Sequence, residues 1–237
     1  MKQETEAKPL LEHIEELRRR LLRALLALAA ATVASFFLAN FILEWLAQPI
    51  GGLENLEAIE VTENLGVFMQ ASLLSGVALA MPVIIYQLWR FVAPGLLPHE
   101  KRYVYWLAPF ATLLFVSGAA FAYYVMLPAA IPALLGFAPI PTRPRPANYF
   151  SFVTSLMFWV GISFEMPLLI FFLAKVRLVS SRTLVRNWRV AVFLIALLAA
   201  LVTPTGDPVN MALVMAPLLV LYLLSLFLAR IAYRREG

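Results

Sequence analysis

The residue with the clearest chemical significance is Glu165, which stands in Phe164-Glu165-Met166-Pro167 about fifteen residues into a long apolar run. A carboxylate near the centre of a bilayer costs a few kcal/mol, so it must be protonated, paired or hydrated. One interpretation is a neutral carboxyl group bonded to a neighbouring helix. The other is a polar spot on a functional face, used by a partner helix, a substrate or water. Ionisable residues inside membrane segments favour the functional interpretation.

Glu16 and Glu100 form a second candidate pair, since both are carboxylates set among arginine and lysine residues. A carboxylate binds a guanidinium group through two hydrogen bonds, so two carboxylates can hold two guanidinium groups. Phe91 precedes Glu100 in a short apolar stretch and offers an adjoining apolar surface. The alternative is local pairing, in which Glu16 binds Arg20 one helical turn away and Glu100 offsets the basic residues that follow it.

The usual signatures of enzymes and metal sites are absent from the sequence. There are no cysteines and only two histidines, His13 and His99. Neither a zinc-protease motif, nor a nucleophile elbow, nor a glycine-rich phosphate loop occurs. We therefore expect no catalytic residue, no metal and no cofactor.

The composition is that of a membrane protein. The chain is 62% hydrophobic and 14% charged, whereas soluble domains are about 25% charged. Its net charge of +5 comes from basic residues that flank apolar runs, so we expect anionic lipid headgroups rather than nucleic acid as partners. The 237 residues are interpreted as one all-α membrane domain.

Apolar runs predict six transmembrane helices, because about 20 residues of helix cross the hydrocarbon core. The fifth run is only 14 residues long, and with the sixth it could form a hairpin that does not fully cross. The predicted spans are residues 21–43, 67–89, 105–126, 150–174, 190–203 and 209–229.

The distribution of basic residues predicts the orientation of these spans. Of the 19 lysine and arginine residues, only Arg143 and Arg145 lie outside the N-terminal segment, the second and fourth connections and the tail. The first connection is acidic and contains no basic residue. By the positive-inside rule both termini are cytoplasmic.

Smaller features predict how the spans begin, bend and pack. Residues 10–20 have helical apolar spacing and are expected to lie as an amphipathic helix along the cytoplasmic interface. Prolines within or beside the spans predict a bent, concave bundle. Those in the loop 127–149 favour an extended, semi-rigid external cap. Ser72, Gly76 and Ala80 provide a small-residue stripe for close helix packing.

Four motifs resemble the TatC family of twin-arginine protein translocase subunits and extend over nearly the whole chain. They are HIEELRRRL at 13–21, YQLWRFVAPGL at 86–96 followed by HEKR at 99–102, GISFEMP at 161–167 and TPTGD at 203–207. This resemblance implies a receptor in the bacterial or archaeal cytoplasmic membrane that binds twin-arginine signal peptides of folded cargo. It also implies single-span TatA-type and TatB-type partners, transport driven by the proton-motive force, and a homo-oligomer within a larger complex.

The resemblance also assigns roles to residues. Glu16 and Glu100 match the signal-binding acids of the family, with Phe91 and Arg18 beside them. Glu165 matches the intramembrane glutamate on the concave face, where partner or signal helices dock. Two positions have less definite roles: Pro49 matches a proline near the external loop, and Asp207 lies where the sequence departs from the family and could cap the final helix.

Two other functions compete with this interpretation. A proton-coupled transporter of small solutes would use Glu165 as its protonation site, but it predicts further midplane polar groups and usually repeat symmetry, neither of which is evident. A membrane scaffold without transport activity would tolerate leucine in place of Glu165.

Overall fold

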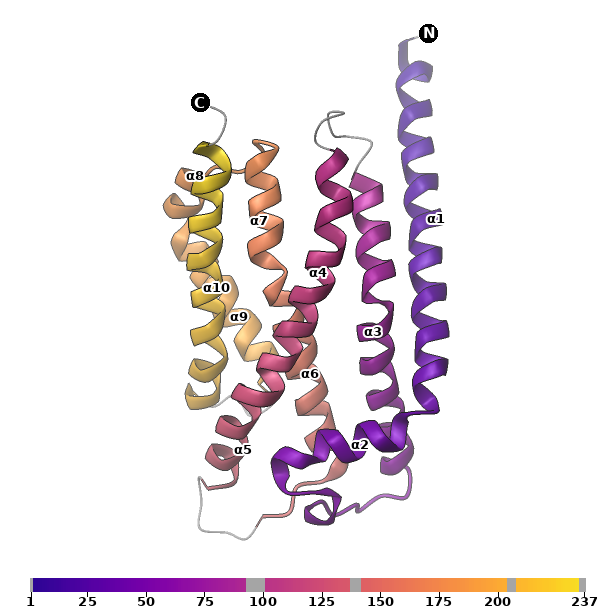
Figure 1. Ribbon diagram of the computed structural model, residues 1–237, viewed down its shortest axis with the longest axis vertical. Coiled ribbons are helices and arrows are strands. Elements are labelled where there is room, and N and C mark those ends of the chain that lie inside the picture. The colour runs from indigo at the N-terminus through magenta and orange to yellow at the C-terminus, as the bar shows by residue number, and fades with distance from the viewer. Residues whose placement is uncertain (1, 93–100, 137–141, 204–207, 235–237) are drawn as a thin grey trace.

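The computed structural model describes residues 2–92, 101–136, 142–203 and 208–234 (Figure 1). All regular structure in these ranges is helical, which confirms the all-α prediction. Glu100 and Asp207 lie outside the described residues. The main helices are α1 (Lys2–Phe36), α2 (Ala39–Ala47), α3 (Glu63–Val92), α4 (Lys101–Phe121), α5 (Leu127–Leu135), α6 (Pro146–Phe164), α7 (Met166–Lys175), α8 (Ser181–Arg186), α9 (Trp188–Val202) and α10 (Pro208–Arg234).

Four described helical segments are long and apolar enough to cross a membrane: Glu63–Phe91, Pro109–Leu135, Pro146–Lys175 and Met211–Ala232. A fifth candidate is the pair His13–Phe36 and Ala39–Ile50, which is bent by 79°. α9 has 15 residues, about 22 Å of helix against roughly 30 Å of hydrocarbon. The structure thus supports four to five spans, and the six-span count stays a prediction.

The bundle has two ends that are easily distinguished in Figure 1. Both termini, α8 and the beginning of α4 lie at one end, here called the terminal end. α2 and α5 lie at the opposite end, here called the loop end.

At the beginning of the chain, one long helix covers the predicted amphipathic segment 10–20 and most of the predicted span 21–43. α1 runs without a break from Lys2 to Phe36, because residues 10–36 contain neither proline nor glycine. The chain then turns by 79° before α2. At this turn Phe37 and Leu38 donate to carbonyl groups three residues earlier, at 3.3 and 3.0 Å. The segment 21–43 is therefore a bent pair of helices.

The second long loop also differs from the prediction of extended, proline-stiffened chain. A π-helical segment, Ala122–Met126, joins α4 directly to α5. Pro128 lies in the first turn of α5, a position that tolerates the missing N–H group. Leu127 and Ile131 are buried, so apolar packing offsets the cost of Pro132 inside the helix.

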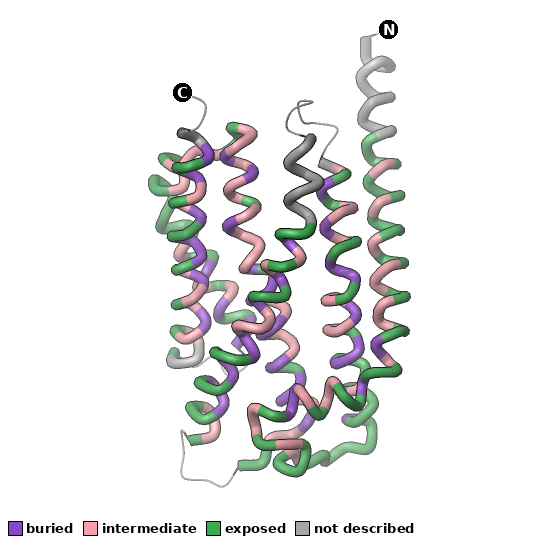
Figure 2. The backbone as a smooth tube through the Cα atoms, viewed as in Figure 1, coloured by how far each residue is buried: buried purple, intermediate pink, exposed green. Residues whose placement is uncertain are grey.

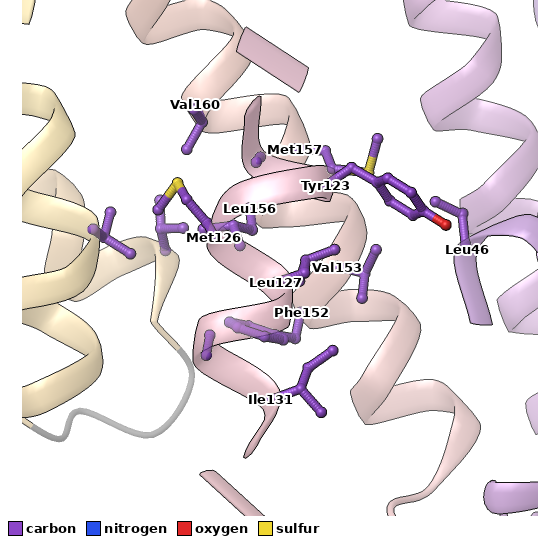
Figure 3. Close-up of a cluster of buried hydrophobic side chains, with 14 of the residues drawn as sticks. Leu46, Tyr123, Met126, Leu127, Ile131, Phe152, Val153, Leu156, Met157 and Val160 are labelled. Carbon is purple, nitrogen blue, oxygen red and sulfur yellow. The ribbon is translucent and has the colours of Figure 1, made fainter. Parts of the chain in front are cut away.

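The largest buried cluster joins the loop-end half of the bundle. It contains side chains of α2, α3, the π-helical segment, α5, α6, α9 and α10, and Figure 3 shows its centre. Burial is concentrated where these helices face one another, whereas their outward faces are exposed (Figure 2). Two tyrosines tie α2 to this cluster: Tyr123 donates to the Trp45 carbonyl at 2.5 Å and Tyr149 to that of Leu46 at 2.8 Å.

The small-residue stripe on α3 is buried, and its central residue Gly76 lies against α1. Ser72, Gly76 and Ala80 are all buried. A Cβ atom at Gly76 would lie 2.7 Å from the Cα atom of Thr32. Since α1 packs principally against α3, this crossing sets the position of α1 and of the residues it carries.

An ion-pair network at the loop end joins the two long connections. Arg145 donates from Nε to Glu63 at 2.6 Å and from Nη2 to Glu60 at 2.8 Å. Glu63 also accepts the backbone N–H of Ile59 at 2.9 Å. These hydrogen bonds hold the pKa of the Glu63 carboxyl below its usual range although burial acts against them. The network makes a defined cap from loops that the sequence only predicted to be ordered.

Candidate functional site

Glu16 and Phe91, two of the predicted binding residues, lie on neighbouring helices at the terminal end. His13 on α1 bridges them. Its ring stacks on Phe91 of α3 with a centroid distance of 4.5 Å and an interplanar angle of 23°. Its Nδ1 atom lies 4.0 Å from a carboxylate oxygen of Glu16. The structure therefore brings a carboxylate and an aromatic surface together, although the two residues are 75 positions apart in the sequence.

The carboxylate of Glu16 already has a guanidinium partner. Arg20 donates to the same Glu16 oxygen from Nε at 3.0 Å and from Nη2. This hydrogen bond is the largest cause of a Glu16 pKa below the usual range, and the nearby positive charges of Arg20, His13 and Arg19 act in the same direction. Glu16 is consequently ionised at neutral pH. The local pairing between Glu16 and Arg20 that the sequence left open is present.

Arg20 differs from the other arginines of α1 in its burial. Its side chain is 13% exposed and Glu16 is 32% exposed, whereas Arg19 and Glu15 form a looser pair at 3.7 Å with both side chains mostly exposed. Arg18, the fourth predicted binding residue, is exposed and forms no ion pair with a residue whose side chain is described. Arg20 was not among the predicted site residues, although its i, i+4 spacing from Glu16 indicated the ion pair between them.

A small hollow adjoins this ion pair. It has a volume of about 130 Å³ and lies between α1 and α3. Arg20, Gln87 and Phe91 contribute to its wall, and the remaining lining is aliphatic. The Oε1 atom of Gln87 is buried and accepts no hydrogen bond from the described residues. The site thus combines a charged carboxylate, an unused amide acceptor and an apolar wall.

Glu165 lies at the break between α6 and α7. Pro167 follows in the first turn of α7, where its missing N–H group interrupts the hydrogen-bond ladder. The Oε1 atom of Glu165 is buried and has no hydrogen-bond partner among the described residues. Close packing of α4 on α6 lies one turn away, where a Cβ atom at Gly161 would approach the Phe115 ring to 2.8 Å. One oxygen of this carboxyl group is therefore an unsatisfied acceptor within an apolar segment.

A larger groove runs between α1, α3 and α6. Its volume is about 300 Å³, and it is lined mainly by apolar side chains together with Gln70, Thr154 and Ser155. Pro49, the other predicted residue within the described ranges, is half-buried in a short 3-10 turn, Gln48–Ile50, after α2. No cluster of three or more potential metal ligands occurs among the described residues.

These features define a multi-pass helical membrane protein with a carboxylate paired to an arginine at one end and a carboxyl oxygen without a described partner within a span. Comparison with known proteins identifies the family. The sequence model of the family described as "Sec-independent protein translocase protein (TatC)" matches residues 12–217. The chain belongs to the TatC family, and it is a subunit of the Sec-independent, twin-arginine translocation system. Such a subunit is a component of a transport system rather than a classical enzyme.

Relatives and solved structures match over almost their full lengths. The Sec-independent protein translocase protein TatC of Carboxydothermus hydrogenoformans is 34% identical over 230 residues, which cover 96% of this chain and 95% of the relative. The TatC of Aquifex aeolicus is 35% identical, with coverages of 96% and 97%. A crystal structure described as the twin-arginine translocase receptor TatC superposes with a TM-score of 0.85 at 35% identity, covering 94% of this chain and all of that one.

Proposed function

We propose that this subunit is the receptor that reads the twin arginines of signal peptides, with Glu16 and Phe91 at its centre. The observation that carries the proposal is the Glu16–Arg20 pair beside Phe91. A carboxylate that already holds one arginine side chain has the geometry to hold another. The apolar wall beside it suits the hydrophobic segment that follows the arginines of such a signal.

Arginine is preferred over lysine at such a site for a geometric reason. The guanidinium group is planar and presents paired donors that match both oxygens of a carboxylate, whereas an ammonium group is a point charge. Glu100 would bind the second arginine, and Arg18 would flank the site. This arrangement predicts that twin-arginine peptides bind more tightly than twin-lysine peptides of the same charge.

In the proposed transport cycle, docking at the terminal end is followed by contact with Glu165. The apolar part of the signal, or the helix of a single-span TatA-type or TatB-type partner, would bring a polar group to the unsatisfied Oε1 atom. The short α9 would thin the bilayer locally through hydrophobic mismatch, which eases the passage of folded cargo. We further propose six spans with both termini cytoplasmic, in a single membrane domain whose transport is driven by the proton-motive force.

A binding experiment with a matched control tests the receptor proposal. Purified protein in detergent is titrated with a fluorescent signal peptide that bears twin arginines, and separately with its twin-lysine version. Glu16→Gln is compared with Glu15→Gln, which removes a neighbouring exposed carboxylate from the same helix.

We expect Glu16→Gln to weaken twin-arginine binding by about tenfold, an effect typical of losing a charge-assisted hydrogen bond. Glu15→Gln should remain within about twofold of the unmodified protein. The proposal is wrong if Glu16→Gln binds the peptide normally while retaining its fold. It is also wrong if the twin-lysine peptide binds equally well.

A further inference from the structure

The connection from α7 to α9 carries an unusual concentration of positive charge. Between Met166 and Gly206 the sequence contains five basic residues and no acidic residue. The basic residues are Lys175, Arg177, Arg182, Arg186 and Arg189.

Three of these arginines form an exposed surface at the terminal end. Arg182 and Arg186 lie one turn apart on α8, and Arg189 lies in the first turn of α9. All three are exposed and form no ion pair with a residue whose side chain is described. The guanidinium carbon of Arg189 lies 5.9 Å from the centre of the Trp188 ring. Their charges are thus available to an external anion.

Exposed apolar side chains are interleaved with these arginines. Leu178 is 74% exposed, Val185 44% and Trp188 53%. The exposure continues along one face of α9, through Val190, Phe193, Leu194, Leu197 and Leu201. A surface that alternates arginine with exposed leucine, valine and tryptophan matches the headgroup region of a bilayer, where tryptophan and basic side chains both concentrate.

The packing of α8 fixes the orientation of this surface. The Tyr222 hydroxyl group of α10 donates to the carbonyl of Leu184 at 2.8 Å. The Ser180 hydroxyl accepts the backbone N–H of Thr183 at 3.1 Å and caps the helix. With Leu184 held toward α10, the neighbouring Val185 and Arg186 are left exposed.

The short length of α9 places the arginines near its beginning close to the lipid phosphates. Its 15 residues give a helix of about 22 Å, shorter than the roughly 30 Å hydrocarbon core. A short apolar helix draws its flanking residues toward the lipid headgroups or thins the bilayer around it. Either response brings Arg182, Arg186 and Arg189 to the level of the phosphates.

We propose that α8 and the first turn of α9 form a binding surface for anionic phospholipid headgroups, in which Arg182, Arg186 and Arg189 contact the phosphates and Trp188 and Val185 contact the adjoining acyl chains. An acidic protein partner would satisfy the arginines, but it would leave the interleaved apolar side chains and the apolar face of α9 without a matching surface. The proposal is independent of the receptor site, which lies on α1 and α3.

Because the chain contains no cysteine, a single Val185→Cys substitution gives a unique labelling position beside these arginines. The protein is labelled there with a bimane fluorophore and reconstituted into phosphatidylcholine vesicles. Brominated phosphatidylglycerol or brominated phosphatidylcholine is then included at equal mole fractions as the quencher. A basic residue at an anionic surface is worth roughly a fivefold local enrichment. We expect phosphatidylglycerol to be the more effective quencher by at least about threefold, with the preference falling as salt is added.

Two variants with equal loss of charge make the test specific. In the Arg182→Gln, Arg186→Gln, Arg189→Gln variant, the preference for phosphatidylglycerol should disappear. In the Arg19→Gln, Arg23→Gln, Arg90→Gln variant, whose changes lie on α1 and α3, the preference should remain. Equal quenching by both lipids in the original labelled protein overturns the proposal. The proposal is also overturned if neither lipid quenches the fluorophore. A preference for phosphatidylglycerol that persists after the α8–α9 substitutions overturns it as well. The far-ultraviolet circular dichroism of each variant verifies its helical fold.

Discussion

Replacing Gly76 by alanine tests how closely α1 and α3 must pack at the crossing that positions the proposed receptor site. The added Cβ atom would lie 2.7 Å from the Cα atom and 2.8 Å from the backbone nitrogen of Thr32, whereas ordinary contacts begin at 3.4 Å. The helices must therefore separate by about 0.7 Å at this point. Overpacking of this kind costs about 1–3 kcal/mol. The Thr32 hydroxyl group is contacted as well and can rotate away, but the two backbone atoms cannot, so side-chain rotation alone does not relieve the clash.

Gly66→Ala is the matched control, because no atom lies within 4 Å of the corresponding Cβ position. In a helix this change gains up to about 1 kcal/mol of propensity, which Gly76→Ala gains as well. The difference between the two unfolding free energies therefore isolates the steric cost of about 1–3 kcal/mol. Titration with a denaturing detergent in mixed micelles, followed by circular dichroism, measures both values. Agreement of the two variants within about 0.5 kcal/mol would refute this account of the crossing.

Three further predictions concern the charged groups. Arg20→Gln removes the internal competitor for Glu16, so titration with a fluorescent twin-arginine peptide should show about two- to fivefold tighter binding; weaker binding would mean that Arg20 supports the site. Since hydrogen bonds from the Ile59 backbone and from Arg145 hold the pKa of Glu63 below its usual range, the stability that this carboxylate contributes is full above its unfolded pKa of about 4.5. That stability is lost as the pH falls through the lower folded value. Thermal unfolding below pH 4.5 should reveal the loss, and a Glu63→Gln variant with the same acid dependence would contradict the assignment. Glu165→Leu should fold with equal or greater stability, because it removes an unsatisfied acceptor, yet abolish export of a twin-arginine reporter; normal export would favour a scaffold without transport activity.

Helix type and approximate position were predictable from the sequence because apolar runs of about 20 residues have few alternatives in a membrane. The interruption of the fourth span at Glu165 was also visible in advance, since Pro167 lies two positions further on. The bend at Phe37 was not predictable, because no proline or glycine marks it. That bend depends on tertiary contacts of α2, such as those between its backbone and the hydroxyl groups of Tyr123 and Tyr149.

The prediction of an extended loop at 127–149 was wrong for a related reason. Proline restricts the backbone, but it does not exclude the first turn of a helix, and the burial of Leu127 and Ile131 favours a helix there. Similarly, Arg143 and Arg145 were used only to predict the orientation of the spans. The pairing of Arg145 with Glu63 joins positions 82 apart in the sequence, so local spacing carries no sign of it.

For the candidate site, Glu16 and Glu165 were predictable as residues of interest, but the hydrogen-bond partners of each carboxyl group were not. Glu16 already accepts two hydrogen bonds from Arg20, so an incoming arginine must share or exchange this partner. Such an exchange yields little net free energy and is weakened by salt, which suits reversible sampling of signal peptides. The Oε1 atom of Glu165 has no partner among the described residues, so any donor that reaches it adds a hydrogen bond in apolar surroundings without breaking one. In the proposed transport cycle the two acids would therefore serve successive steps. Exchange with Arg20 would keep signal binding at Glu16 reversible, whereas a donor that reaches Glu165 would gain a hydrogen bond at no such cost.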